Sequence, residues 1–349
     1  MTKRTGMIPV DPVPGEPRAA TRPTMRAVVQ HHYGTFPEGV FHLETVDRPS
    51  VADDEVLVRV RAAGLDRGTW HLMAGRPYLM RAMGFGVRRP KNTVPGLDVA
   101  GVVEAVGSAV TRFTIGDEVF GIARGSFAEY AAAKEAKLAA KPASLSFEQA
   151  AVVPISALTA LQALRDAAPV EAGQKVLVIG ASGGVGTYAT QLAVSFGAEV
   201  TGVCSAAKAD LVRSLGARVV LDYRTQDFAD GTQHYDVILD VAGNSRLSRL
   251  RRALTPGGTL VIVGGEEGGD MTGGFGRSLR APVLSLFVRQ RLLMLVAKER
   301  GADLDALTPL LEAGQVTPAL DTTFPLSQAP AAMRHLMTGQ ARGKIAIST

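Results

Sequence analysis

The hydrophobic pattern divides the chain into two parts. Residues 55–62 alternate apolar and charged side chains, which predicts a half-buried strand, and further short β-like segments make residues 25–145 β-rich. From residue 146 onward, short apolar runs alternate with segments of helical period, which predicts βαβ units and a parallel, doubly wound sheet. The pattern predicts strands at 176–179, 199–203, 218–221, 236–240 and 259–263, helices at 147–151, 157–166, 186–196, 206–215, 245–254 and 303–313, and a closing strand at 343–348.

The most informative stretch runs from Lys175 to Gly186. An apolar strand there ends at a glycine-dense turn and a helical pattern follows at once, with Gly180, Gly183 and Gly186 three residues apart. Glycine permits positive φ and leaves no Cβ between the backbone and a bound pyrophosphate. The helix that follows directs its free N–H groups and the positive end of its dipole toward that anion. We therefore predict the phosphate-binding corner of a dinucleotide site, although glycines also serve plain turns.

Composition limits the class of protein. The 349 residues suffice for two domains, and 46% hydrophobic and 20% charged residues are typical of a soluble globular protein. The net charge of +5 is spread along the chain, which argues against nucleic acid as a partner. A single cysteine excludes an internal disulfide and a cysteine-based zinc cluster, and it favours a reducing cytoplasm.

No segment predicts a membrane partner. No apolar run reaches the roughly 18–20 residues of a membrane span. Residues 1–24 contain five prolines and no apolar core of signal-peptide length. We interpret them as a flexible N-terminal tail.

Six segments make the chain resemble a known superfamily. They are VRVRAAGLDRGTWHLMAGRPY (58–78), VPGLDVAGVVEAVGSAVTRFTIGDEVFG (94–121), GSFAEYAAA (125–133), AAVVPISALTALQAL (150–164), VLVIGASGGVGTYATQLA (176–193) and ARGKIAI (341–347). In this order and spacing the chain resembles the medium-chain dehydrogenase/reductase superfamily, and within it the zinc-independent quinone oxidoreductase branch. The resemblance implies a GroES-like β-rich domain formed by residues 25–150 and 304–349, a Rossmann domain at 151–303, and a homodimer.

The metal positions of the superfamily are altered in this chain. Zinc members place Cys, His and Cys around a catalytic metal, and the first two positions match Asp66 and Leu97 here. Cys204 follows the second Rossmann strand and cannot be the third ligand, so too few ligands remain for zinc. Without a Lewis acid, we expect hydride addition to an acceptor that is already electrophilic, such as a quinone or a conjugated carbonyl.

The second Rossmann strand favours NADPH over NADH. An NAD-preferring site places an acidic residue at the end of that strand, but this strand ends at Cys204 and Ser205. The resemblance gives Ser205, Lys208 and Tyr223 the role of binding the 2′-phosphate, although Lys208 can also be a solvated lysine at a helix start. The predicted cofactor residues are Thr159, Gly180, Gly183, Gly184, Val185, Gly186, Ser205, Lys208, Tyr223, Ala242, Gly243, Asn244, Val263, Gly264 and Lys344.

The substrate side rests mainly on the resemblance. It implies that Tyr78 hydrogen-bonds the substrate oxygen or supplies a proton, with Asp66 as the second catalytic candidate. A quinone that accepts a hydride can also take its proton from water. Core packing is an open alternative for one of the pocket candidates, Trp70. The candidate pocket residues are Trp70, His71, Phe275 and Phe287.

Two segments keep more than one interpretation. Residues 88–91, RRPK, form either an exposed basic loop or a phosphate contact for an acyl-CoA substrate. Residues 280–298 mix bulky apolar residues with arginines and predict either a strand at a dimer interface, as in the superfamily, or a core helix. The sequence as a whole predicts an NADPH-dependent, zinc-free reductase of quinones or α,β-unsaturated carbonyls. The alternatives are an enoyl-thioester reductase and a non-catalytic NADPH-binding sensor.

Overall fold

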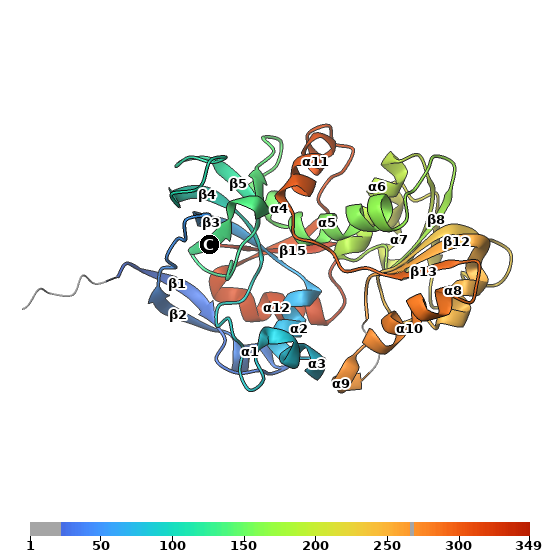
Figure 1. Cartoon of the computed structure of the whole chain (residues 1–349), viewed down its shortest axis with the longest axis horizontal. Helices are drawn as coiled ribbons and strands as arrows, with labels where there is room; N and C mark the ends of the chain where they lie inside the picture. The colour runs from blue at the N-terminus through green and yellow to red at the C-terminus, as the bar shows by residue number, and fades with distance from the viewer. Residues whose placement is uncertain (1–21, 266–268) are drawn as a thin grey trace, which may run out of the picture.

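The structure is a computed structural model that describes residues 22–265 and 269–349. Two large β-sheets, each with its helices, lie side by side along the long axis of the molecule (Figure 1). Most of the tail expected at residues 1–24 lies outside the described residues. Strand β1 (Thr24–Val29) begins at the last residue of the expected tail and pairs with β2 (His42–Asp47).

The predicted parallel, doubly wound sheet is confirmed. Among the described residues it has six strands in the order β10-β9-β8-β11-β12-β13, and every neighbouring pair is parallel. The winding reverses between β8 and β11, and ligands bind outside the carboxyl ends of strands at such a point. The bounds are β8 (Lys175–Ile179), β9 (Glu199–Cys204), β10 (Val219–Asp222), β11 (Tyr235–Asp240), β12 (Leu254–Ile262) and β13 (Arg291–Met294).

The second sheet is mixed and includes the end of the chain. Its order is β14-β15-β3-β4-β5-β7, with β6 paired to β3, so β15 returns to lie antiparallel to β3. The strand expected at 55–62 continues to residue 65 because its second half is buried on both faces. The bounds are β3 (Glu55–Leu65), β4 (Asp98–Val106), β5 (Glu118–Ile122), β6 (Tyr130–Lys134), β7 (Leu138–Ala140), β14 (Leu320–Pro325) and β15 (Lys344–Ser348).

Most helices lie near their expected positions. The helix expected at 157–166 begins three residues earlier, because Pro154 has the φ of a first helical residue, and it ends in a π-turn at 163–167. The segment 280–298 contains the end of one helix and the edge strand β13, so the expected strand is present over part of it and no core helix fills it; the dimer interface stays a prediction. The bounds are α1 (Pro37–Val40), α2 (Arg67–Ala74), α3 (Tyr78–Met80), α4 (Phe147–Ala151), α5 (Pro154–Gln162), α6 (Gly184–Ser195), α7 (Ala209–Ser214), α8 (Leu247–Ala253), α9 (Gly269–Thr272), α10 (Phe275–Ser285), α11 (Gly301–Glu312) and α12 (Ala329–Met337).

Helix α5 lies between the two sheets and joins their cores. A single buried cluster runs from Phe120 of β5 through Leu158 and Leu161 of α5 to Val176 of β8. Because these apolar side chains pack continuously, the carboxyl ends of the parallel strands are held at a defined place relative to the mixed sheet.

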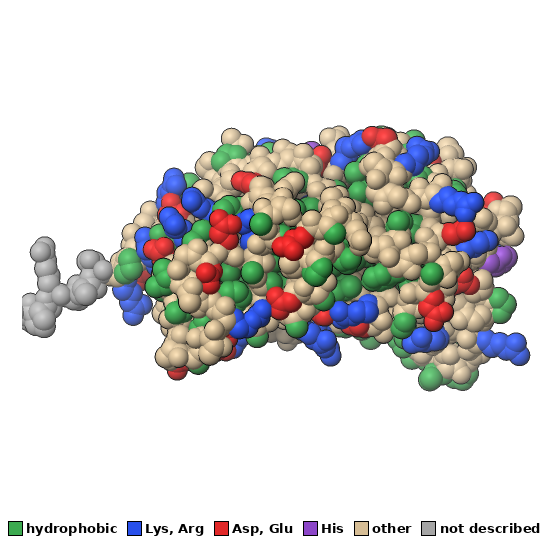
Figure 2. Space-filling model, turned by 90° about the horizontal axis from the view of Figure 1, so that it is seen from above, with side chains coloured by type: hydrophobic (Ala, Val, Ile, Leu, Met, Phe, Trp, Pro, Cys, Tyr) green, Lys and Arg blue, Asp and Glu red, His purple; other side chains and the backbone are tan. Residues whose placement is uncertain are grey.

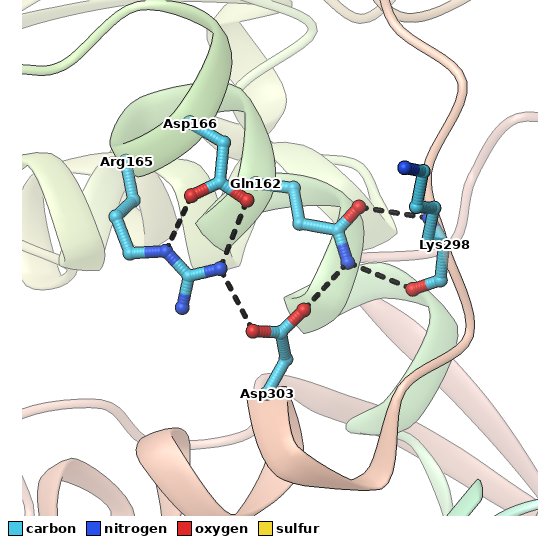
Figure 3. Close-up of polar contacts among 5 residues, drawn as sticks. All are labelled: Gln162, Arg165, Asp166, Lys298 and Asp303. Atoms are coloured by element: carbon cyan, nitrogen blue, oxygen red, sulfur yellow. Dashed lines mark hydrogen bonds and ion pairs between the residues drawn. The ribbon is translucent and has the colours of Figure 1, made fainter.

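A polar network ties the end of α5 to the C-terminal part of the chain (Figure 3). Gln162 Nε2 donates to Lys298 O at 2.7 Å and to Asp303 Oδ2 at 2.9 Å, and Gln162 Oε1 accepts the Lys298 N–H at 2.8 Å. Asp303 Oδ1 accepts a bond from Arg165 Nη2 at 2.7 Å, and Arg165 also pairs with Asp166. The network holds the chain where it leaves β13 and enters α11. The domain boundary expected at 303/304 lies inside α11, and the domain limits remain a prediction.

The surface carries positive and negative side chains side by side (Figure 2). No helix in the described ranges is long and apolar enough to cross a membrane. On the face drawn in Figure 2, Lys and Arg side chains are interspersed with Asp and Glu and form no continuous positive stripe. The expected lack of nucleic-acid and membrane partners, and the cytoplasmic location, stay predictions.

Candidate cofactor and substrate site

The glycine-rich turn after β8 leads directly into α6. Gly180 has a φ of +89°, and a Cβ there would lie 3.0 Å from Ala242 N. A Cβ on Gly186 would lie 2.1 Å from the Gly180 backbone oxygen, so no side chain fits. A Cβ on Gly183, the N-cap of α6, would lie an ordinary 3.4 Å from that oxygen. The fold itself therefore requires Gly180 and Gly186, whereas Gly183 leaves space before the helix N-terminus, where an anion would bind.

Lys344 of the last strand lies against the same turn. Its side chain is 2% exposed, and a Cβ on Gly184 would lie 2.8 Å from Lys344 Cδ and 3.2 Å from Ser156 Oγ. Lys344 Nζ lies 3.4 Å from Asp98 Oδ2, and Asp98 Oδ1 accepts the Ile155 N–H at 2.9 Å. Asp98 thereby joins β15, β4 and the start of α5 beside the glycine-rich turn.

The buried carboxyl of Asp98 gives the protein a defined pH dependence. Burial raises its pKa from 3.8 to about 7, and the attraction of Lys344 offsets this only in part. Between these values the folded state keeps a proton that the unfolded chain has lost. The extra proton on Asp98 therefore adds to the free energy of unfolding. This contribution is complete at low pH and decreases as the pH rises toward 7.

Replacing Asp98 by Asn should remove this fall, which is on the order of 1 kcal/mol per pH unit. Urea unfolding of the wild type and of Asp98→Asn between about pH 5 and 7 checks the expectation. The wild type should lose stability relative to the variant as the pH rises. A difference between the two proteins that is constant over this range contradicts it.

Residues that follow the carboxyl ends of β9 and β10 lie close together at one edge of the parallel sheet. The Tyr223 N–H donates to Cys204 O at 3.2 Å, which places Tyr223 beside Ser205. Lys208 Nζ donates at 2.7 Å to two backbone oxygens of the 339–341 turn, and burial lowers the pKa of this lysine. The backbone thus places Ser205, Lys208 and Tyr223 near one another, and their role toward a 2′-phosphate stays a prediction.

Arg342 is a further cation here that the sequence prediction missed. Its Nη1 donates to Ala207 O at 2.8 Å, across 135 residues of sequence, and its Nη2 pairs with Asp210 at 2.5 Å. No pattern near the second Rossmann strand could indicate it, because it arrives with the returning chain end. Acidic residues lie at the same edge, since Asp210 pairs with Arg342 and Asp222 is in register with Cys204.

The loops after β11 and β12 pack on each other near the point between β8 and β11 where the winding of the parallel sheet reverses. A Cβ on Gly243, whose φ is +72°, would lie 2.5 Å from the Gly264 carbonyl carbon. A Cβ on Gly264 would lie 2.0 Å from the Val241 oxygen. On α5, the Thr159 hydroxyl donates a hydrogen bond within its own helix, to Ile155 O at 2.6 Å. The predicted cofactor residues on these two loops, next to the turn at Gly180, are Ala242, Gly243, Asn244, Val263 and Gly264.

The two catalytic candidates have different surroundings. Asp66 is the N-cap of α2, where its Oδ1 accepts the Thr69 N–H at 2.8 Å and the Thr69 hydroxyl at 3.0 Å. The sequence prediction missed this capping role, although an Asp directly before a helix is a known signal for it. Tyr78 begins α3, is 37% exposed, and has the Arg81 guanidinium 4.7 Å from its ring centre. Of the two, Tyr78 has the freer functional group.

The four candidate pocket residues do not form one group. Trp70 and His71 make an edge-to-face contact at 4.9 Å, and Trp70 also packs against a buried apolar cluster. His71 Nδ1 lies 2.9 Å from Arg76 O. The Phe275 side chain lies outside the described part of the structure. Phe287 is 80% exposed in the turn after α10, so the structure presents its ring to solvent and does not place it in a pocket wall.

The residues present do not fit a zinc ion. Within residues 22–265 and 269–349, no three His, Cys, Asp or Glu side chains gather closely enough to hold a metal. Leu97 offers no ligand atom, and Asp66 uses one oxygen to cap α2. The Cys204 thiol is buried, and this burial raises its pKa, whereas zinc requires a thiolate.

Known proteins share this architecture. Residues 52–143 match the alcohol dehydrogenase GroES-like domain, and residues 215–347 match a family described as zinc-binding dehydrogenase. A chloroplastic quinone-oxidoreductase homolog from Spinacia oleracea is 33% identical, over 93% of this chain and 98% of its own. An NADPH-dependent alkenal/one oxidoreductase from Arabidopsis thaliana is 33% identical, over 93% of this chain and 79% of its own. The solved quinone oxidoreductase from Coxiella burnetii has a TM-score of 0.82 at 28% identity, covering 94% of this chain and 100% of that one.

The fold and these matches define an oxidoreductase built from a GroES-like part and a nucleotide-binding Rossmann sheet. The chain belongs to the medium-chain dehydrogenase/reductase superfamily, in its quinone oxidoreductase branch. The zinc in the name of one matching family has no ligand set among the described residues of this chain.

Proposed function

We propose that the protein transfers a hydride from NADPH to a quinone or an α,β-unsaturated carbonyl. The observation that carries the proposal is that Ser205, Lys208, Tyr223 and Arg342 lie together beside the glycine-rich turn, with no acidic residue at the end of β9. A 2′-phosphate would add a charge-assisted partner to Lys208 and Arg342, whose present partners are backbone oxygens and Asp210. Two relatives support the acceptor class, since one is named a quinone-oxidoreductase homolog and the other an NADPH-dependent alkenal/one oxidoreductase.

The chain's own residues would bind and orient both reactants. The space at Gly183 and the N-terminus of α6 suits the pyrophosphate, and the loops after β11 and β12 suit the nicotinamide half. When bound, the nicotinamide supplies the hydride. Tyr78 would donate a hydrogen bond to the acceptor oxygen and thereby favour the negative charge that develops there. The Arg76–Asp270 ion pair, at 3.0 Å, links the segment just before Tyr78 to helix α9.

A turnover assay tests the proposal directly. The loss of NADPH absorbance is followed with a quinone, an enone and an enoyl-CoA as acceptors, and NADH is the comparison cofactor. Turnover of the quinone or the enone with NADPH is the expected result. Turnover of the enoyl-CoA alone would instead favour the enoyl-thioester reductase. NADPH binding without turnover of any acceptor would favour the sensor.

Lys208→Ala should reduce kcat/KM for NADPH about 30-fold and kcat/KM for NADH much less, because NADH lacks the 2′-phosphate that the ammonium group would bind in addition to the backbone oxygens of the 339–341 turn. Lys175→Ala is the matched control, since Lys175 is exposed at the opposite, amino end of β8. Equal losses with both cofactors would show that Lys208 supports the 339–341 turn and not the phosphate.

We also propose that two copies of the chain associate through the β13 edge. Among the described strands β13 pairs only with β12, and the adjacent α10 exposes apolar side chains on one stripe. An unpaired strand edge beside exposed apolar surface favours association. Phe287→Glu should convert a dimer to a monomer in sedimentation, and a wild-type monomer would refute the proposal. The stripe consists of Leu279, Val283, Leu286 and Phe287, which are 58% to 81% exposed.

A further inference from the structure

A buried ion pair lies behind the two loops at the switch point. Asp240, the last residue of β11, is fully buried, and Arg277 of α10 has a side chain that is 16% exposed. Arg277 Nη1 contacts the Asp240 carboxylate directly. Neither residue belongs to the predicted cofactor set, and no sequence motif joins them.

Arg277 bonds to both loops at once. Its Nη1 also donates to Ser245 O at 2.7 Å, at the end of the loop after β11. Its Nη2 donates to Gly264 O at 3.0 Å, in the loop after β12. The planar guanidinium therefore fixes the distance between the two backbone oxygens, as a lysine ammonium could not.

Asp240 holds the same loops from the strand side. Its Oδ1 accepts the Gly243 N–H at 3.1 Å. Its backbone oxygen accepts the N–H groups of Val263 and Gly264 at 3.0 Å and 3.2 Å. Three loop residues of the predicted cofactor set are thus bonded to Asp240, and one of them is also bonded to Arg277.

Stability alone does not explain this pair. Burial raises the pKa of Asp240, and the attraction of Arg277 and the Gly243 N–H only partly offset it. Arg277 Nε is buried and has no hydrogen-bond partner among the described residues, which is a further cost. Buried pairs of this kind are commonly no more stable than apolar side chains of similar volume, but they can fix one geometry.

We propose that Arg277 is a positioning residue that sets the spacing of the two loops around the nicotinamide half of the cofactor. This inference rests on the proposed function. Arg277 acts through Ser245, Gly264 and Asp240 and does not itself touch the cofactor. Its loss should weaken binding of the nicotinamide half and leave the adenine half, which β8, β9 and β10 would hold, unaffected.

The test compares two ligands by calorimetry on the full chain. NADPH reports both halves of the cofactor, and adenosine 2′,5′-bisphosphate reports the adenine half alone. In Arg277→Gln the Kd for NADPH should rise about tenfold, the loss of one well-placed polar contact, while the Kd for the bisphosphate stays within about twofold. The matched control is Arg280→Gln, because Arg280 is exposed on the same helix. It should change neither Kd.

A second variant keeps the test decisive if Arg277→Gln does not fold. Arg277→Lys retains the charge beside Asp240 but loses the two-oxygen bridge, so it should also weaken NADPH and spare the bisphosphate. Wild-type affinity of Arg277→Lys for NADPH would overturn the inference, as would equal weakening of both ligands. Failure of the wild type to bind either ligand would overturn the proposed function itself, which is a distinguishable result.

Discussion

Alanine at Gly186 should destabilise the fold, whereas alanine at Gly183 should weaken only the binding of the cofactor. The Cβ at Gly186 would lie 2.1 Å from the Gly180 oxygen and 2.8 Å from Ala181 Cα, both backbone atoms. This overlap should cost about 3 kcal/mol, more than the roughly 1 kcal/mol that alanine gains over glycine inside a helix. At Gly183 the Cβ meets an ordinary contact, and the φ of −86° suits alanine, so unfolding should change by less than about 1 kcal/mol.

Cofactor binding separates the two variants further. A methyl group at Gly183 would stand where the pyrophosphate approaches, and a similar steric cost corresponds to about 100-fold weaker NADPH binding. Thermal unfolding and NADPH titration of both variants provide the measurement. Gly257→Ala is the control, because a Cβ there meets nothing within 4 Å. A folded Gly183→Ala protein that binds NADPH normally would show that the glycine serves only the turn.

Gln162→Leu should destabilise the protein by about 3 kcal/mol. Leucine is close to glutamine in size, so no large cavity forms, but the Lys298 N–H, the Lys298 carbonyl and one Asp303 oxygen lose their partner (Figure 3). Each of these three groups, one buried and two partly buried, costs about 1 kcal/mol when it is left without its hydrogen bond. Urea unfolding with a two-state fit measures the loss.

The control for this prediction is Gln233→Leu, because Gln233 is exposed before β11. It should leave the unfolding midpoint essentially unchanged. If Gln162→Leu unfolds at the wild-type midpoint, the Gln162 network does not fix the path of the chain between β13 and α11.

Local features were predictable because their causes are local. The strand, turn and helix from Lys175 onward depend on an apolar run, three glycines and a helical period within 20 or so residues, and all three elements are present. Element boundaries were less certain. The expected helix at 206–215 divides into a 3₁₀ turn at 206–208 and α7, since Lys208 departs from helical angles with a φ of −119° and a ψ of 7°.

The chemistry of individual side chains was predicted less well than their location. Asp66 caps α2 through its Oδ1, a role that the sequence interpretation missed, and its part in catalysis stays a prediction. Phe287 was expected in the pocket wall because of its apolar ring, but the turn after α10 exposes it. The hydrophobicity of a ring indicates that it is more stable when buried. It does not indicate whether the burying surface belongs to the same chain or to another chain.

The sequence by itself determined the superfamily, the order of strands and helices, and the glycine-rich turn, because each depends on neighbouring residues or on ordered segments. Only the tertiary structure decided which distant charges meet. Lys344 lies against Asp98 across 246 residues, Arg342 reaches Ala207 across 135, and Arg277 joins Asp240 across 37. Such pairs follow from the packing of two sheets and the return of the chain end, and no period or spacing in the sequence encodes that packing.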